Sequence, residues 1–161
     1  MALVIRRATA ADAQTIAVFA RRLAQQHLDY DERRFSPLGS QAQAAAFYER
    51  QTSAEDSAVL VAELDGKVVG FAFVEFELKN YADLLESAAR IHDLYVDEAA
   101  RGCNAGKSLL AAASEAAKEF GASKLILSVA VQNENARRLF ERAGFETTML
   151  EMMLGLTDIE K

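Results

Sequence analysis

The sequence contains one cysteine, one proline and no tryptophan. A single cysteine, Cys103, cannot form an internal disulfide, so we expect a reducing compartment and a cytoplasmic protein. One proline and no long polar tract argue against a disordered chain. No apolar run approaches the ~20 residues that a membrane-spanning helix needs, and the apolar start Met1–Ile5 is too short for a signal peptide. We therefore expect a folded protein that does not act on membranes.

The chain of 161 residues has the size of one domain, so we expect a single domain over residues 1–161. Its apolar fraction of 51% and charged fraction of 26% are those of ordinary soluble globular proteins. The net charge of −6 disfavours a nucleic-acid partner, because phosphate backbones bind basic surfaces. Mild acidity also keeps a protein soluble, so it does not by itself identify a cationic substrate.

Apolar residues recur with the periods of strands and helices along the chain. Strands are expected at Leu3–Arg7, Ala58–Leu64, Lys67–Leu78, Arg90–Val96, Lys124–Val131 and Phe145–Leu154. A first helix is expected from a capping box at Thr9–Asp12 to near His27. Further helices are expected at Gln41–Gln51, Ala105–Phe120 and Asn133–Ala143. The segment Asn80–Ala89 is expected to be a loop or one helical turn. An Asp65-Gly66 turn joins two antiparallel strands, whereas the strand, loop, helix and strand from residue 90 to 131 require a parallel crossover. The sequence thus predicts an α/β fold with a mixed sheet.

The loop that follows Val96 has the composition of a phosphate-binding loop. It opens a helix, whose first N–H groups point outward and carry partial positive charge. Glycines or small side chains leave these groups accessible, and two basic residues add positive charge; the residues concerned are Arg101, Gly102, Ala105, Gly106, Lys107 and Ser108. The pattern is neither a P-loop nor a dinucleotide-binding turn, and taken alone it also fits a purely structural turn and cap.

Two linked motifs make the pattern specific. Arg101-x-x-Asn104-x-Gly106 resembles the Arg/Gln-x-x-Gly-x-Gly/Ala acyl-CoA motif of the GNAT acetyltransferase family. The segment from Asn133 to Phe145 resembles the family's Asn-x-x-Ala-x-x-Leu-Tyr-x-x-x-Gly-Phe segment. The resemblance implies the GNAT fold, with six or seven mixed strands and about four helices, acetyl-CoA as cosubstrate and direct acetyl transfer to a primary amine. It also implies a possible homodimer, for which the apolar segment Met149–Leu156 is the candidate contact.

The same resemblance assigns cofactor contacts. Backbone groups of Leu94, Tyr95 and Val96 would bind the pantetheine arm, and amides of Gly102, Cys103, Asn104, Ala105, Gly106 and Lys107 would hold the pyrophosphate, next to Arg101 and Ser108. Asn135 would contact the pantetheine, although it also fits a helix-cap role. Asn104 replaces a glycine, and Asn is the next most tolerant residue for left-handed backbone. Phe140 replaces a tyrosine, so it can pack against the cofactor but cannot protonate the departing thiolate.

Three residues are candidates for the group that removes a proton from the amine. Glu75 and Glu77 lie two apart on one strand and share a face with Phe71 and Phe73. Histidine is a common proton acceptor, and His92 occupies a position where diamine acetyltransferases of the family have Glu. Simpler roles remain open, namely a solvated strand end for the glutamates and a hydrogen bond within the sheet for the histidine. Neighbouring strand residues face opposite ways, so the side chains of His92 and Asp93 are expected on opposite faces of the sheet.

The sequence leaves the acceptor open. The first hypothesis is a small primary amine such as a polyamine, amino acid or amino sugar. The second is a protein lysine or N-terminus, and the third is a non-catalytic acyl-CoA-binding module, which Phe140 favours. With two histidines and one cysteine, no metal site is expected. Cys103 lacks an obvious neighbouring base and is not expected to act as a nucleophile.

Overall fold

The computed structural model describes residues 1–157. Five strands form one mixed sheet in sequence order: β1 (Leu3–Arg7), β2 (Ser57–Leu64), β3 (Lys67–Glu77), β4 (Ala88–Val96) and β5 (Leu125–Leu127). The first four strands pair antiparallel, and β4 pairs parallel with β5. The mixed α/β fold expected from the crossover between residues 90 and 131 is therefore confirmed.

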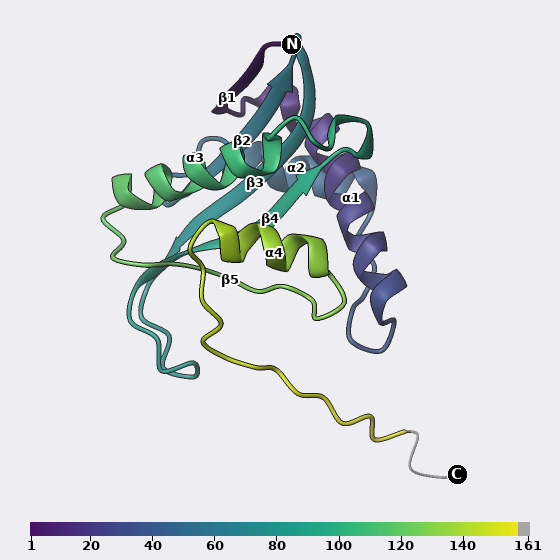
Figure 1. Ribbon diagram of the computed structural model, residues 1–161, viewed down its shortest axis with the longest axis vertical. Coiled ribbons are helices and arrows are strands. Elements are labelled where there is room, and N and C mark those ends of the chain that lie inside the picture. Colours follow the sequence, from purple (N-terminus) through teal and green to yellow (C-terminus); the bar gives the residue numbers. More distant parts are fainter. Residues whose placement is uncertain (158–161) are drawn as a thin grey trace.

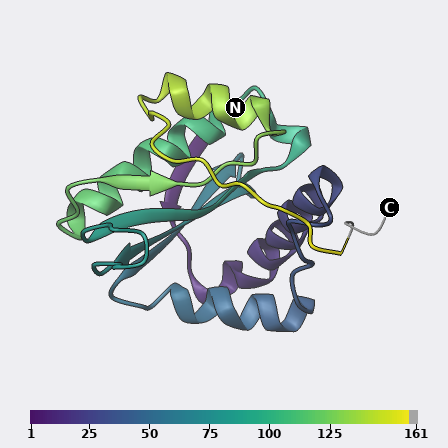
Figure 2. The ribbon, with the colours of Figure 1, turned by 90° about the horizontal axis from the view of Figure 1, so that it is seen from below.

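Four α-helices cover the two faces of this sheet (Figure 1). They are α1 (Ala13–Tyr30), α2 (Gln41–Gln51), α3 (Ala105–Glu119) and α4 (Glu134–Arg142). Figure 2 shows α1 and α2 on one face and α3 and α4 on the other, with the sheet between them. Short 3-10 turns, η1 (Ala10–Asp12) and η2 (Glu98–Ala100), precede α1 and α3. None of the helices in residues 1–157 combines the length and apolar character that crossing a membrane requires.

Alternation along the strands divides the interior into two cores. On the α3 side, Leu109 and Ala113 are fully buried against β-strand residues such as Val74. On the α1 and α2 side, Phe71 and Phe73 pack with Ile16 of α1 and with aromatic residues of α2. The helical spacing of α3 and the period-two spacing of β3 thus both place their apolar sides inward, as expected.

The end of the chain differs from the sequence expectation. Instead of six or seven strands, five are found among the described residues, and the expected strand Phe145–Leu154 pairs with no other strand there. An extended segment becomes a strand only when its N–H and C=O groups find a neighbouring ladder. Large apolar side chains of this segment stay exposed, with Leu150 78% and Met152 91% accessible.

Smaller differences concern element lengths. The expected strand Lys124–Val131 reduces to the three residues of β5, because its pairing with β4 stops after Leu127. Helix α1 continues to Tyr30 instead of fraying near His27. Within the segment Asn80–Ala89, residues 80–85 form a turn closed by an Asn80–Leu85 bridge, and β4 begins at Ala88, two residues before the expected Arg90.

Candidate active site

The site lies where β4 and β5 separate. Their parallel ladder runs from Ala89–Leu125 to Ile91–Leu127, whereas β4 continues to Val96. Beyond this point the chain after β5 turns away from β4 (Figure 1). Among residues 1–157, the second half of β4 therefore pairs with β3 alone, and the backbone groups of its other edge have no strand partner there.

The loop at the N-terminus of α3 has the expected left-handed geometry. Gly102 has φ 86°, and Asn104, the N-cap of α3, has φ 65° and ψ 10°. A Cβ on Gly102 would meet no atom within 4 Å, so the positive φ and not a lack of space is what requires glycine there. The first hydrogen bond of the helix runs from Ser108 N–H to Asn104 O at 3.0 Å. The N–H groups that precede Ser108 lie in the first helical turn, the part of a helix that binds anions.

Other residues of this loop have structural partners. A Cβ on Gly106 would lie 3.2 Å from Leu139 Cδ2, so this glycine allows α3 and α4 to approach each other. Ala105 is buried at 2% exposure, and the half-buried Cys103 thiol donates to Ala100 O at 2.7 Å. Arg101 is exposed and pairs with Glu98 at 3.4 Å, and Lys107 is exposed. The glycine at position 106 thus serves helix packing, a reason that the sequence motif did not reveal.

Helix α4 presents its two candidate residues differently. Asn133 caps the helix by accepting from Ala136 N–H at 3.2 Å, which leaves the exposed Asn135 without the capping role. Phe140 is 8% exposed and packs against Phe145 with ring centroids 5.9 Å apart. Its ring belongs to the core on the α3 side, so its first role is structural.

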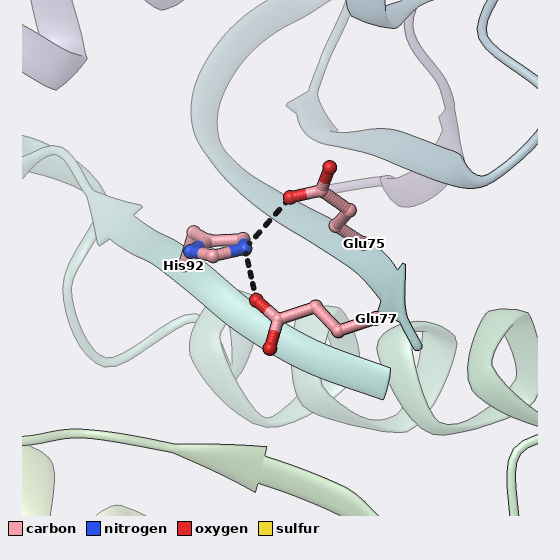
Figure 3. Close-up of side chains that lie close together, drawn as sticks. All are labelled: Glu75, Glu77 and His92. Carbon is pink, nitrogen blue, oxygen red and sulfur yellow. Dashed lines mark ion pairs between the residues drawn. The ribbon is translucent and has the colours of Figure 1, made fainter. Parts of the chain in front are cut away.

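Glu75, Glu77 and His92 come together at the surface of β3 and β4 (Figure 3). His92 Nε2 lies 2.9 Å from Glu75 Oε2 and 3.1 Å from Glu77 Oε1. We call these three residues the acid–histidine cluster. A ring nitrogen that carries a hydrogen can donate it to the carboxylate oxygens it faces, so the cluster places an imidazole and two carboxylates, all groups that can take up a proton, within hydrogen-bond distance. The expectation that both glutamates share one face is confirmed.

Two neighbours hold the cluster in place. Arg90 Nε contacts Glu77 Oε1 and Oε2 at 3.1 and 3.0 Å. The ring of Phe73 stacks on His92 with centroids 5.3 Å apart and planes 27° apart. The potential ligand atoms of the cluster lie within 4.8 Å of one another, a spacing that the sequence did not suggest. Arg90 contacts Glu77 and the imidazole contacts both glutamates, so each carboxylate has a nitrogen partner within this group.

A β-bulge corrects the expectation for Asp93. Phe73 pairs with Asp93 and the next residue, Val74, pairs with Ile91, so His92 is an extra residue in β4. An extra residue interrupts the alternation of side chains. As a result, His92 and Asp93 both face the α1 and α2 side, the first on Phe73 and the second in contact with α2.

Asp93 accepts a hydrogen bond from Tyr48 Oη at 2.8 Å. Burial raises the pKa of the Asp93 carboxyl group above its usual range, and the Tyr48 hydrogen bond offsets part of this increase. Burial, together with the charge of Asp93, also raises the pKa of Tyr48 above its usual range, so the phenol stays protonated as the donor. Sequence reasoning missed this pair because Tyr48 lies 45 positions away on another element.

Comparison with known proteins bears on the family and the fold of the chain. A model of the acetyltransferase (GNAT) family matches residues 21–145. The uncharacterized N-acetyltransferase YhfO of Bacillus subtilis is 32% identical over 103 residues, which are 64% of this chain and 68% of that protein. An N-alpha-acetyltransferase of Sulfurisphaera tokodaii is 31% identical over 105 residues, covering 62% of this chain and 63% of that protein, so the match leaves over a third of it unaligned.

The fold is also that of solved acetyltransferase structures. The aminoglycoside N-acetyltransferase AAC(6')-Iy in complex with CoA superimposes with a TM-score of 0.78 at 17% identity, over 96% of this chain and 94% of that one. This likeness concerns the fold, whereas the family match rests on the sequence between residues 21 and 145. The chain belongs to the acetyltransferase (GNAT) family.

Proposed function

We propose that this protein transfers the acetyl group of acetyl-CoA to a primary amine of a small molecule, with the acid–histidine cluster as proton acceptor. The observation that carries the proposal is the position of His92 Nε2, 2.9 and 3.1 Å from two carboxylates beside the opening between β4 and β5. An imidazole and carboxylates that share a proton provide the base that amine acylation needs.

The acceptor arrives as an ammonium ion. Making it neutral at pH 7 costs about 4 to 5 kcal/mol for a pKa near ~10.4. The cluster takes this proton, the neutral nitrogen attacks the thioester carbonyl, and an N–H group of the free β4 edge stabilises the oxyanion. The C–S bond then breaks, the attacking nitrogen releases its second proton to solvent, and the amide forms. CoA leaves as a thiolate, which its ordinary thiol pKa near ~8.5 permits, and takes its proton from solvent because Phe140 has none to give.

The cofactor is proposed to lie along the free edge of β4. Backbone groups of Leu94–Val96 would hydrogen-bond the pantetheine, and the N–H groups of the 102–107 loop would hold the pyrophosphate. The left-handed Gly102 and Asn104, with the first helical bond starting only at Ser108, support this placement. Asn135, exposed on α4, is the proposed side-chain contact.

A protein N-terminus is the second candidate acceptor. It is favoured by the similarity to the Sulfurisphaera tokodaii N-alpha-acetyltransferase, which is 31% identical over 105 residues. The small-molecule acceptor is favoured by the acidic side chains gathered at the site, because a small cationic amine can reach them directly. Glu75 and Glu77 keep 36% and 26% of their side-chain surface accessible.

An acceptor panel tests the proposal. Purified protein with acetyl-CoA is given small amines and, separately, peptides with free N-termini or lysines, and the release of free CoA thiol is followed. We expect turnover on small amines and slower or no turnover on peptides. Turnover confined to peptides would replace the first candidate by the second. Tight acetyl-CoA binding without turnover on any acceptor would contradict both.

We also propose a homodimer. The apolar side chains Met149, Leu150, Met152 and Leu154 are 73–91% exposed on the extended C-terminal segment, an unusual number for a monomer surface. Light scattering after size-exclusion chromatography is expected to give twice the chain mass of 17.6 kDa. Met152→Lys should shift the species toward the monomer, whereas Leu84→Lys, at a residue 93% exposed in the turn before β4, should not. A wild-type monomer at micromolar concentration would contradict the proposal.

A further inference from the structure

Among the partly buried carboxylates of residues 1–157, Asp93 and Glu75 lack an arginine or lysine partner, and Glu75 contacts the imidazole of His92. Within residues 1–157, arginines pair with Asp12, Asp31, Glu63, Glu77 and Asp97, whose side chains are 10–29% exposed. Asp93, which is also half-buried, takes part in no ion pair in this part of the chain. Its one bonding partner there is the neutral hydroxyl of Tyr48, at 2.8 Å.

A half-buried carboxylate without a cation is costly, because burial removes water that would stabilise its charge. Burial raises the pKa of Asp93, while Tyr48 and the imidazoles of His92 and His27 counteract this change. The surroundings of the carboxylate therefore favour the arrival of a positive charge. Tyr48 itself is 4% exposed and surrounded by Phe47, Phe71 and Phe73, so it holds the carboxylate in a fixed position.

The bulge at His92 places this carboxylate on the same face as the acid–histidine cluster. The two groups have different surroundings, since the cluster is open to solvent and Arg90 pairs with its Glu77, whereas Asp93 is bound to the buried Tyr48. The reacting nitrogen must become neutral before it attacks, so it would leave a carboxylate unpaired as the reaction proceeds. A second ammonium group of the same acceptor would keep its charge throughout.

We infer that Asp93, held by Tyr48, is the counter-ion for a second positively charged group of the acceptor, and that the enzyme selects acceptors carrying two positive charges. The inference rests on the proposed small-amine acetyltransferase function. The small amines considered above were polyamines, amino acids and amino sugars. The inference excludes ordinary amino acids, because Asp93 and Glu75 would repel their carboxylate. Tyr48 does not touch the reacting atoms and is a positioning residue.

The test compares an alkyl diamine with the monoamine of equal chain length. Steady-state kinetics of the wild type are expected to give a kcat/KM about 10- to 100-fold higher for the diamine, as for a charge-assisted hydrogen bond. Asp93→Asn, which still accepts from Tyr48, should abolish this preference, mainly by raising KM for the diamine. Tyr48→Phe keeps the ring packing but loses the hydroxyl, and should reduce the preference in part. Asp56→Asn, at an exposed aspartate before β2, is the matched control and should retain it.

Two kinetic results would overturn the inference. One is a wild type that does not distinguish diamine from monoamine. The other is an Asp93→Asn variant that loses activity equally on the diamine and the monoamine. That pattern would indicate that the Tyr48–Asp93 hydrogen bond only holds α2 against β4. Calorimetric titration of the CoA-loaded protein with the diamine gives a readout independent of turnover. Diamine binding that weakens in Asp93→Asn supports the inference even without catalysis, and no diamine binding by the wild type overturns it.

Discussion

Replacing His92 with Gln is expected to lower kcat on a small amine by about 10²- to 10⁴-fold, the usual contribution of a general base. Gln retains a polar side chain of similar length but cannot take up a proton at neutral pH. His92 Nε2 contacts Glu75 and Glu77 at 2.9 and 3.1 Å, so its removal also breaks the proton-sharing arrangement. The measurement is kcat and KM for the amine, with KM for acetyl-CoA expected to change little.

Glutamine variants of Glu75 and Glu77 measure how much each carboxylate contributes to kcat. Glu75→Gln removes the carboxylate that lacks an arginine partner and should lower kcat more than Glu77→Gln, since Glu77 is held and neutralised by Arg90. Glu115→Gln on the exposed surface of α3 is the matched control. Wild-type rates and pH profiles in all three cluster variants would show that the base lies elsewhere.

Gly70→Ala is expected to destabilise the fold by about 1–3 kcal/mol, the cost of inserting a methyl group into a packed interior. A Cβ at this position of β3 would lie 2.6 Å from Tyr95 O and 3.2 Å from Val96 Cα, both backbone atoms of β4. The strand must therefore shift at the end that carries the proposed pantetheine contacts. We expect a lower denaturation midpoint and weaker acetyl-CoA binding by calorimetry.

Gly39→Ala is the control for this substitution. A Cβ there would meet Gln43 Oε1 at 2.6 Å, the end of a flexible side chain whose displacement would cost at most its hydrogen bond from Ser40 N–H. Its effect on stability should be well below that of the Gly70 variant, and acetyl-CoA binding should be unchanged. Equal effects of both substitutions would mean that the close approach of β3 and β4 does not limit stability.

Phe140, which stands where the family usually has tyrosine, was considered for two roles, packing in the core and contact with the cofactor. Sequence reasoning treated this ring as a cofactor contact, whereas the structure buries it against Phe145 at 8% exposure. The lack of a hydroxyl at this position is therefore compatible with a well-packed core, and in the proposed reaction thiolate departure would rely on the ordinary acidity of the CoA thiol.

Local sequence patterns determined most of the fold. The spacing of apolar residues in α3, including Leu109 and Ala113, defined a helix because every fourth side chain faces the same way. The Asp65-Gly66 turn defined the hairpin of β2 and β3, and the two-residue spacing of Glu75 and Glu77 put both on one face. The Arg101–Gly106 motif identified the family, and its Asn104 adopts the left-handed backbone expected there.

Only the tertiary structure decided features that depend on pairing between distant segments. The extra residue at His92 exists relative to the register of β3, so no pattern within β4 could reveal it. That register brings His92 to both glutamates and turns Asp93 toward Tyr48 of α2. Likewise, the apolar pattern of residues 145–154 suggested a strand, but a strand needs a partner, and the end of the β4–β5 ladder at Ile91 and Leu127 is a property of the assembled sheet.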